Sequence, residues 1–152
     1  MTLEKNFDFN KFEDQIYQRW LENKCFNPIE SEKQYSIVMP PPNATGILHL
    51  GHSIGLTIQD IMVRFKRMQG HETLYIPGTD HAAIATQSKV EGIIFKETGQ
   101  TRHDIGRENL LSEIDKFVKQ SQETIIKQTM KMGTSCSWDH LKFTLDEKLN
   151  LF

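Results

Sequence analysis

The stretch from Tyr35 to His52, YSIVMPPPNATGILHLGH, decides the fold of this 152-residue chain. It begins with a short apolar run rich in β-branched side chains, which predicts a strand. Prolines at 40–42 follow, and because proline cannot donate to a central ladder, they turn the strand into a loop. A helical pattern resumes near His49. The order strand, loop, helix is typical of an α/β unit.

Two histidines, His49 and His52, stand at the opening turn of that helix, with Gly51 between them. Residues three apart project to the same side of a helix. Free backbone N–H groups and the positive end of the helix dipole favour an anion such as phosphate there. Gly51 lacks a Cβ, so a phosphate or a flat base can approach the backbone. The arrangement suits a nucleotide, although the same spacing also occurs among metal ligands and ordinary partly buried histidines.

The segment resembles the His-x-Gly-His signature of the class I aminoacyl-tRNA synthetases, and the preceding PPPNATG is similar to the sequence that the valine-specific enzymes carry. A second stretch, GTDHAAIATQ at 78–87, is similar to GTDHAGIATQ of the same enzymes. Residues 133–139 and 143–147 resemble them in the same order, so the resemblance covers nearly the whole chain. Ala44 and Ala83 stand where valine and glycine are common in that family, which changes the fine shape of the pocket.

The helix after the proline loop carries apolar residues at spacings of three and four up to Gly70. These residues are Ile54, Ile58, Ile61, Met62, Phe65 and Met68. Residues 73–76 then read as a second strand that ends at Pro77. Strand, helix and strand together predict a parallel, right-handed crossover.

Helices are also predicted over 10–24, 82–96 and 104–132, the last with an interruption near Ser121. Its stop is Gly133, and its inward face carries Leu110, Leu111, Ile114, Phe117, Val118, Ile125, Ile126 and Met130. In the first helix, Asn10 and Glu13 have the spacing of a capping box. One apolar stripe, expected to pack on the sheet domain, contains Phe12, Ile16, Tyr17, Trp20 and Leu21.

The predicted fold class is α/β, with parallel strands flanked by helices and an additional N-terminal helix. Residues 1–34 are expected to form a helical extension that packs on the catalytic core. The resemblance implies that residues 35–152 are the first half of a class I synthetase Rossmann-like nucleotide-binding domain, ending before the editing insertion. No lysine loop, second half of the fold or anticodon-binding helix is recognised in the sequence. An N-terminal fragment that is inactive alone is therefore expected.

Composition argues against several classes of protein. Eighteen basic and 20 acidic residues give a net charge of −2, so no basic field indicates nucleic-acid binding. No apolar run approaches membrane-span length, and residues 1–6 lack the apolar core of a signal peptide, so a cytoplasmic protein is expected. Cys25 and Cys136 form no Cys-x-x-Cys pair, which favours reduced, structural thiols.

The resemblance implies activation of valine by ATP, with Mg²⁺, to valyl-adenylate, followed by transfer to tRNA for valine. His49 and His52 are then the catalytic donors to phosphate oxygens. The nucleotide site would also include Thr45, Gly46 and Gly51. Contacts with tRNA are expected mainly outside this chain, and the full-length protein is expected to be a monomer without membrane association.

For the amino acid, Asp80 is the natural partner of the substrate ammonium, since a carboxylate in a partly dry cleft forms charge-assisted hydrogen bonds. Asp80 could also be a helix N-cap. Pro40, Pro41 and Asn43 match family positions that line the amino-acid pocket, and His81 would complete the cleft. Ligands bind beyond the carboxyl ends of parallel strands, so Asp80 and His49 are expected to share one cleft.

Three other functions fit parts of the sequence. A free-standing nucleotidyltransferase shares the His-x-Gly-His site but leaves the stretch at 78–87 unexplained. A metal-dependent hydrolase could use His49, His52, Asp80 and His81 as ligands. Such a site would not explain the prolines at 40–42. A non-catalytic tRNA-binding module is disfavoured by the even charge balance. No protein-bound metal is predicted.

Overall fold

The computed structural model describes residues 7–149. Residues 1–6, where the sequence predicts no signal peptide, and 150–152 lie outside the described part. The elements, in chain order, are η1 (Phe9–Lys11), α1 (Glu13–Glu22), β1 (Gln34–Val38), α2 (Leu50–Met68), β2 (Glu72–Ile76), β3 (Gly78–Thr79), α3 (Ala83–Thr98), α4 (Arg102–Ile105), α5 (Arg107–Lys131), η2 (Trp138–His140) and β4 (Lys142–Phe143).

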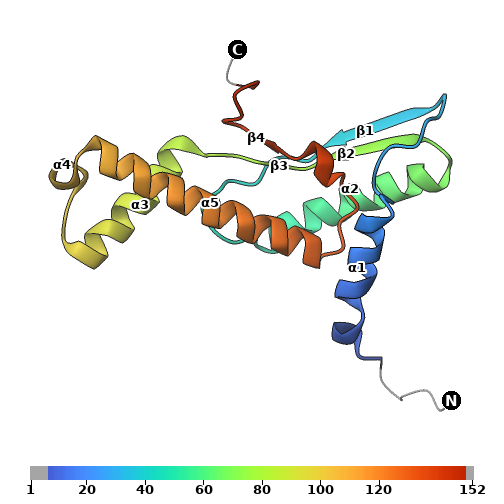
Figure 1. The fold of residues 1–152 in the computed structure, drawn as a ribbon, viewed down its shortest axis with the longest axis horizontal. Helices are drawn as coiled ribbons and strands as arrows, with labels where there is room; N and C mark the ends of the chain where they lie inside the picture. The colour runs from blue at the N-terminus through green and yellow to red at the C-terminus, as the bar shows by residue number, and fades with distance from the viewer. Residues whose placement is uncertain (1–6, 150–152) are drawn as a thin grey trace.

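The predicted crossover is confirmed. β1 and β2 pair in parallel, in register from Gln34 opposite Glu72 to Val38 opposite Ile76, and α2 connects them. A second small ladder continues from the first, because β3 follows β2 after one residue and pairs in parallel with β4 from the far end of the chain. Figure 1 shows β4 beside β3, where the polypeptide returns to the sheet.

The hydrophobic core lies between β1, β2, α2 and the segment after α5. Its buried members are Met39, Leu56, Val63, Tyr75 and Cys136, with Tyr35, Ile37, Leu48 and Trp138 packed around them. The backbone N–H of Ser137 donates to the carbonyl of Tyr75 at 2.8 Å, so this segment is joined to β2 beyond simple packing.

The apolar stripe that predicted α2 is not the face that packs on the sheet. Leu56 and Val63 are buried, whereas the six residues of the stripe are 49–87% exposed: Ile54, Ile58, Ile61, Met62, Phe65 and Met68. The two strands cover one side of α2, and spacings of three and four are the same whichever side a neighbour covers. The pattern thus predicted the helix correctly without identifying its buried face.

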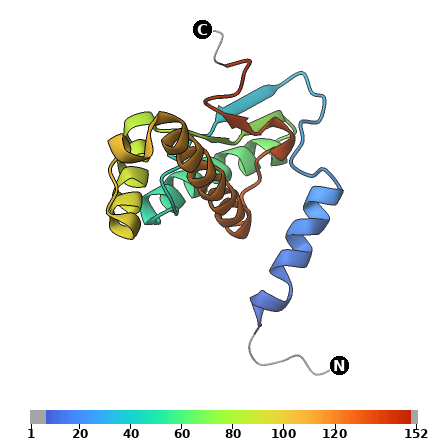
Figure 2. The ribbon, with the colours of Figure 1, turned by 60° about the vertical axis from the view of Figure 1, so that its left-hand side comes forward.

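α1 begins at Glu13, and residues 9–11 form a 3-10 helix instead of its first turn. The predicted capping box is wrong: Phe12 occupies the N-cap, without a side-chain cap. α1 extends away from the sheet (Figure 2). Of its predicted stripe, Tyr17 is buried, while Phe12 and Ile16 are each 45% exposed.

The other helices agree with the sequence except at one break and at Leu111, which was expected on the inward face of α5 and is 47% exposed. α3 ends at Thr98 and is capped by Gly99, whose φ of +71° suits glycine. The stretch predicted over 104–132 is divided at Gly106, with a φ of +78°, and runs unbroken through Ser121. Figure 1 shows α3 alongside α5, with α4 at their shared end. The buried residues of α5 are Leu110, Val118, Ser121, Ile125 and Thr129.

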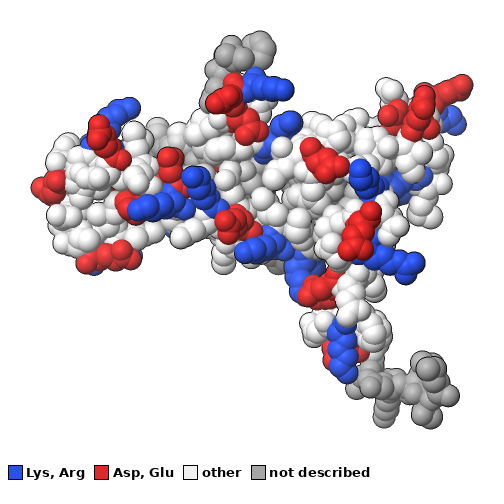
Figure 3. Space-filling model, viewed as in Figure 1, with Lys and Arg blue, Asp and Glu red and all other residues white. Residues whose placement is uncertain are grey.

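On the face of the molecule seen in Figure 3, neither sign of charge dominates. Figure 3 shows lysine and arginine interspersed with aspartate and glutamate over the visible face, in keeping with a net charge of −2. Within residues 7–149, no helix combines the length and the apolar character that crossing a membrane requires.

Candidate functional site

The loop after β1 is hydrogen-bonded to the residues after β2. The N–H of Ala44 donates to the carbonyl of Asp80 at 2.6 Å, and the N–H of Asp80 donates to the carbonyl of Pro42 at 2.8 Å. Asn43 and Asp80 form an isolated parallel bridge. The loop that carries Asn43 therefore meets Asp80 beyond the carboxyl ends of β1 and β2, in line with the rule for parallel strands. A cleft shared by Asp80 and His49 stays a prediction.

His49 and His52 cap the N-terminus of α2. The N–H of Gly51 donates to Nδ1 of His49 at 3.1 Å, and the N–H of His49 donates to Nδ1 of His52 at 3.2 Å. The two rings lie 3.9 Å apart between centroids, tilted by 42°. The histidines thus act as a pair that satisfies backbone donors at the start of the helix.

This capping determines where the protons lie on the rings. An imidazole nitrogen that accepts a hydrogen bond carries no proton, so each neutral ring keeps its proton on Nε2. Burial of the ring lowers the pKa of His52 from its usual 6.5, and the charge of His49 adds to that effect. His52 is therefore suited to present a neutral Nε2–H donor beside a helix N-terminus, where an anion is favoured, and the cap likewise leaves Nε2 of His49 outside it.

Gly51 has a role that the sequence did not reveal. A Cβ at this position would stand 3.0 Å from Cε1 and 3.1 Å from Nδ1 of His49. The missing side chain therefore makes room for the His49 ring to fold back over the helix start. We predicted that Gly51 would admit a ligand to the backbone; the observed close contact is with the capping ring.

Thr45 and Gly46 lie next to a cation from α3. Lys89 Nζ donates to the carbonyl of Thr45, and a Cβ on Gly46 would stand 3.2 Å from the same Nζ. Gly46 also has a φ of +144°, which favours glycine. No pattern in the sequence predicts this role of Lys89, because its approach depends on how α3 packs on α5.

Asp80 and His81 share one partner, Thr144, which follows β4. Thr144 Oγ1 lies 2.9 Å from Asp80 Oδ1, 2.7 Å from His81 Nδ1 and 3.0 Å from the N–H of His81. His81 Nδ1 is also 3.3 Å from Asp80 Oδ1. The expectation that Asp80 could cap a helix is wrong, since the N-cap of α3 is Ala82 and has no side-chain cap.

The predicted pocket wall is open at the surface. Pro40, Pro41 and Asn43 are exposed, whereas Pro42 between them is buried. Their contact with the amino acid stays a prediction.

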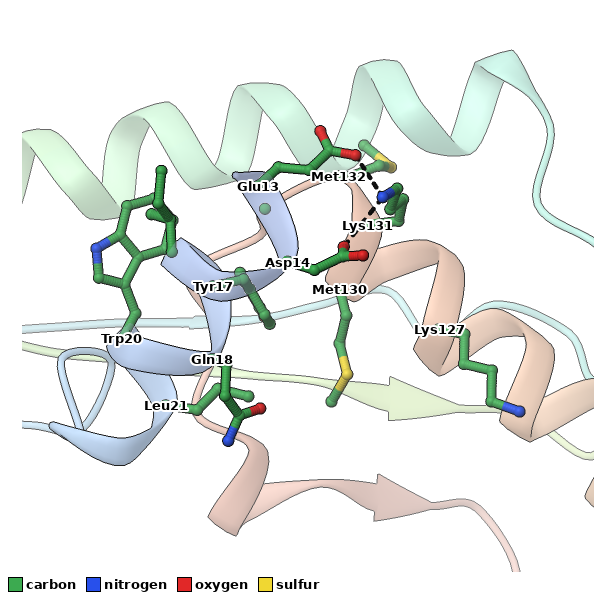
Figure 4. Close-up of a pocket in the computed structure, with 12 residues that line it drawn as sticks. Glu13, Asp14, Tyr17, Gln18, Trp20, Leu21, Lys127, Met130, Lys131 and Met132 are labelled. Carbon is green, nitrogen blue, oxygen red and sulfur yellow. Dashed lines mark hydrogen bonds and ion pairs between the residues drawn. The ribbon is translucent and has the colours of Figure 1, made fainter. Parts of the chain in front are cut away.

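A cavity of about 440 Å³ lies elsewhere, between α1 and the C-terminal end of α5 (Figure 4). Tyr17, Trp20 and Met130 line it, and Lys131 pairs with Glu13 and Asp14 at its edge. Its charged groups thus largely satisfy one another. Among residues 7–149, no group of three or more His, Cys, Asp or Glu side chains is arranged to hold a metal ion.

Comparison with known sequences gives three findings. The model of the family "tRNA synthetases class I (I, L, M and V)" matches residues 15–151. The valine–tRNA ligase of Treponema denticola is 48% identical over 99% of this chain and 17% of its own length. That of Rhodopirellula baltica is 51% identical over 92% of this chain and 14% of its own length.

The fold agrees with a solved structure. The LeuRS of Agrobacterium radiobacter K84, in a ternary complex with tRNA and LeuAMS, matches 95% of this chain and 17% of that one with a TM-score of 0.74, at 18% identity. This likeness supports the α/β assignment. The chain spans 14–17% of the length of the relatives named above.

Proposed function

The chain belongs to the class I tRNA synthetases, and we propose that it supplies the nucleotide and amino-acid sites of a valine–tRNA ligase. Residues 35–152 would be the first half of the catalytic domain and residues 1–34 its helical extension. The substrates would be valine, ATP and tRNA for valine. We further propose a cytoplasmic protein that acts as a monomer.

The observation that carries the proposal is the reciprocal cap of His49 and His52. In the first step, a valine carboxylate oxygen attacks the α-phosphorus of ATP and pyrophosphate leaves. This reaction needs donors aimed at phosphate oxygens rather than a protein nucleophile. The two Nε2–H groups and the start of α2 fit that requirement, with Thr45, Gly46 and Gly51 in the same segment.

Asp80 would hold the ammonium group of valine, and His81 would lie beside it. The two are neighbours of the loop that carries Pro40, Pro41 and Asn43, which would contact the isopropyl group. The first turn of α2 carries no acidic residue. Mg²⁺ would therefore be held here by the phosphate oxygens of ATP, which is its common mode of binding.

A chimera tests this function. In it, residues 1–152 replace the matching 17% of the Treponema denticola ligase. We expect valine-dependent exchange of pyrophosphate into ATP. His49→Ala and His52→Ala should each lower its rate by about 10²–10³. The matched control is His103→Ala, on the exposed helix α4.

Two results would count against the proposal. They are exchange that depends on another acid in place of valine, which would favour the free-standing nucleotidyltransferase, and exchange unaffected by either histidine. Valine-dependent exchange by residues 1–152 alone would contradict only the expectation that the fragment is inactive by itself. A hydrolase that binds a metal through Nδ1 of His49 or His52 would have to break the cap observed at α2.

A further inference from the structure

Thr144 joins two parts of the chain that lie far apart in sequence. β3 and β4 pair through Gly78 opposite Lys142 and Thr79 opposite Phe143. The N–H of Thr144 extends this ladder by donating to the carbonyl of Thr79 at 3.2 Å. Thr144 is thereby placed beside Asp80, the residue that follows Thr79.

The local turn holds Thr144 in this position. The N–H of Phe143 donates to Asp146 Oδ2 at 2.9 Å, and the ring of Phe143 lies edge-on to the imidazole of His81, with centroids 6.5 Å apart. Asp146 thus fixes the turn, while Phe143 supports the His81 ring from one side.

The hydrogen bonds at Thr144 Oγ1 can be assigned by counting donors. A hydroxyl has one proton and two lone pairs. Asp80 as a carboxylate has no proton to give, so the single hydroxyl proton points to its Oδ1 at 2.9 Å. The N–H of His81 fills one lone pair, at 3.0 Å. The remaining partner, His81 Nδ1 at 2.7 Å, must then donate to the other.

The opposite assignment is unfavourable. If the hydroxyl donated to Nδ1 of His81, its lone pair would face the carboxylate of Asp80 at 2.9 Å without a proton between them. Nδ1 would also be 3.3 Å from the same carboxylate oxygen while carrying a lone pair. An unpaired contact between acceptors in a half-buried site costs free energy.

We propose that Thr144 is a positioning residue, which keeps the proton of His81 on Nδ1 and aims the Asp80 carboxylate. His81 then presents the bare lone pair of Nε2, and Asp80 keeps Oδ2 for a second partner. Both atoms are hydrogen-bond acceptors, which suits an ammonium group. The substrate part of this inference rests on the proposed function, whereas the protonation of His81 does not.

His81 thus differs from the two histidines of α2. In His49 and His52 a backbone N–H occupies Nδ1, which leaves Nε2–H as a donor. In His81 the bond with Thr144 reverses this arrangement. The chain would therefore offer donors to phosphate at one place and acceptors to an ammonium at the other.

Nitrogen-15 NMR of the 152-residue chain at neutral pH tests the proton position directly. The His81 signals, assigned by their loss in His81→Gln, should show a protonated Nδ1 and an unprotonated Nε2. Thr144→Ser keeps the hydroxyl and should leave this pattern unchanged. Thr144→Val, which has the same shape without the hydroxyl, should shift the proton toward Nε2. The control is Thr98→Val, which makes the same replacement on α3.

An unprotonated Nδ1 in the unsubstituted chain overturns the proposal without any variant. An unchanged pattern in folded Thr144→Val overturns it as well. If Thr144→Val does not fold, the unsubstituted chain and Thr144→Ser decide.

The positioning role has its own measurement in the chimera. Thr144→Val should raise KM for valine about tenfold, the loss expected for one hydrogen bond at a charged group, while KM for ATP stays unchanged. Thr144→Ser should restore KM for valine. An unchanged KM for valine in Thr144→Val contradicts the positioning role. If the unsubstituted chimera shows no exchange, the proposed function fails, and NMR still decides the inference about Thr144.

Discussion

The backbone N–H of His49 donates to Nδ1 of His52 at 3.2 Å, so the second histidine of the signature caps the first. The Nδ1 of His49 in turn accepts the N–H of Gly51. The two nitrogens of each ring thus have different roles. Capping uses Nδ1, and Nε2–H is left for a ligand.

The capping role of His49 and its role as a donor to the ligand can be separated by substitution. Asparagine is a good N-cap, whereas alanine is a poor one, so His49→Ala should lower the free energy of unfolding by about 1 kcal/mol and His49→Asn by much less. Both should lose exchange activity by about 10²–10³ in the chimera, because neither places an N–H donor where Nε2 was. Urea unfolding and the exchange assay measure the two effects. Equal stability of the two variants would contradict the capping role.

Gly51 and Gly55 provide a matched pair within α2. A Cβ on Gly55 meets no atom within 4 Å, so Gly55→Ala should raise the free energy of unfolding by about 1 kcal/mol. A Cβ on Gly51 would stand 3.0 Å from the ring of His49, which must then move and give up its cap. Gly51→Ala should therefore be less stable than Gly55→Ala. Equal urea midpoints would show that the ring moves at no cost.

His52 should make stability depend on pH. Its pKa in the folded chain is lowered below 6.5, mainly by burial, so the unfolded chain binds more protons in the window just below that pH. The free energy of unfolding then falls as the pH drops through this window, and the contribution is fully present above pH 6.5. Urea unfolding from about pH 7.5 to about pH 5 should show a shallower slope for His52→Asn than for the unsubstituted chain. The matched variant His103→Asn should keep the original slope; a slope that His52→Asn leaves intact would refute the assignment.

Local patterns predicted most of what lies near the first crossover. The apolar run before the prolines predicted β1. The rule that ligand sites lie beyond the carboxyl ends of parallel strands predicted the position of Asp80. Periodicity failed where two arrangements give the same pattern, as on α2, whose exposed stripe and buried residues both fit a helix. It also failed for the cap at Asn10, because residues 9–11 form a 3-10 helix instead of the expected first turn.

Long-range contacts were beyond the reach of the sequence alone. Thr144 and Asp80 are 64 positions apart, and the ladder that joins them is made of strands two residues long, too short for any periodicity. Lys89 reaches Thr45 from α3, 44 positions along the chain, for a similar reason. Packing between distant segments therefore determines the two partners that the sequence did not predict, Thr144 and Lys89. The spacing of the two histidines, by contrast, was enough to predict the histidine pair.

The two cysteines should react at very different rates. Cys25 is exposed, whereas Cys136 is buried in the core, and burial raises its pKa to about 12. The thiolate is the reactive form, so one thiol should react with a thiol reagent in the native chain and two after unfolding. Cys25→Ser should abolish the fast reaction. A fast second equivalent in the native chain would show that the core around Cys136 opens readily.

Tyr17 should hold α1 to the rest of the molecule. Its hydroxyl donates to the carbonyl of Thr134 at 2.9 Å and accepts from Trp138 Nε1 at 2.9 Å. Burial raises the pKa of Tyr17 to about 12, so the hydroxyl keeps its proton at neutral pH. Tyr17→Phe removes both bonds and leaves a carbonyl and an indole N–H without this partner, which should cost about 1–3 kcal/mol.

Urea unfolding gives the total cost of Tyr17→Phe, and amide exchange locates it. If the hydroxyl anchors α1, the amides of residues 13–22 should lose protection while those of β1 and β2 keep theirs. Trp138→Phe, which removes the donor and leaves the Tyr17 hydroxyl bonded to Thr134, should show a smaller change in α1. Protection lost equally in α1 and the strands would instead mean that Tyr17 stabilises the fold as a whole, because the helix and the sheet would then unfold together.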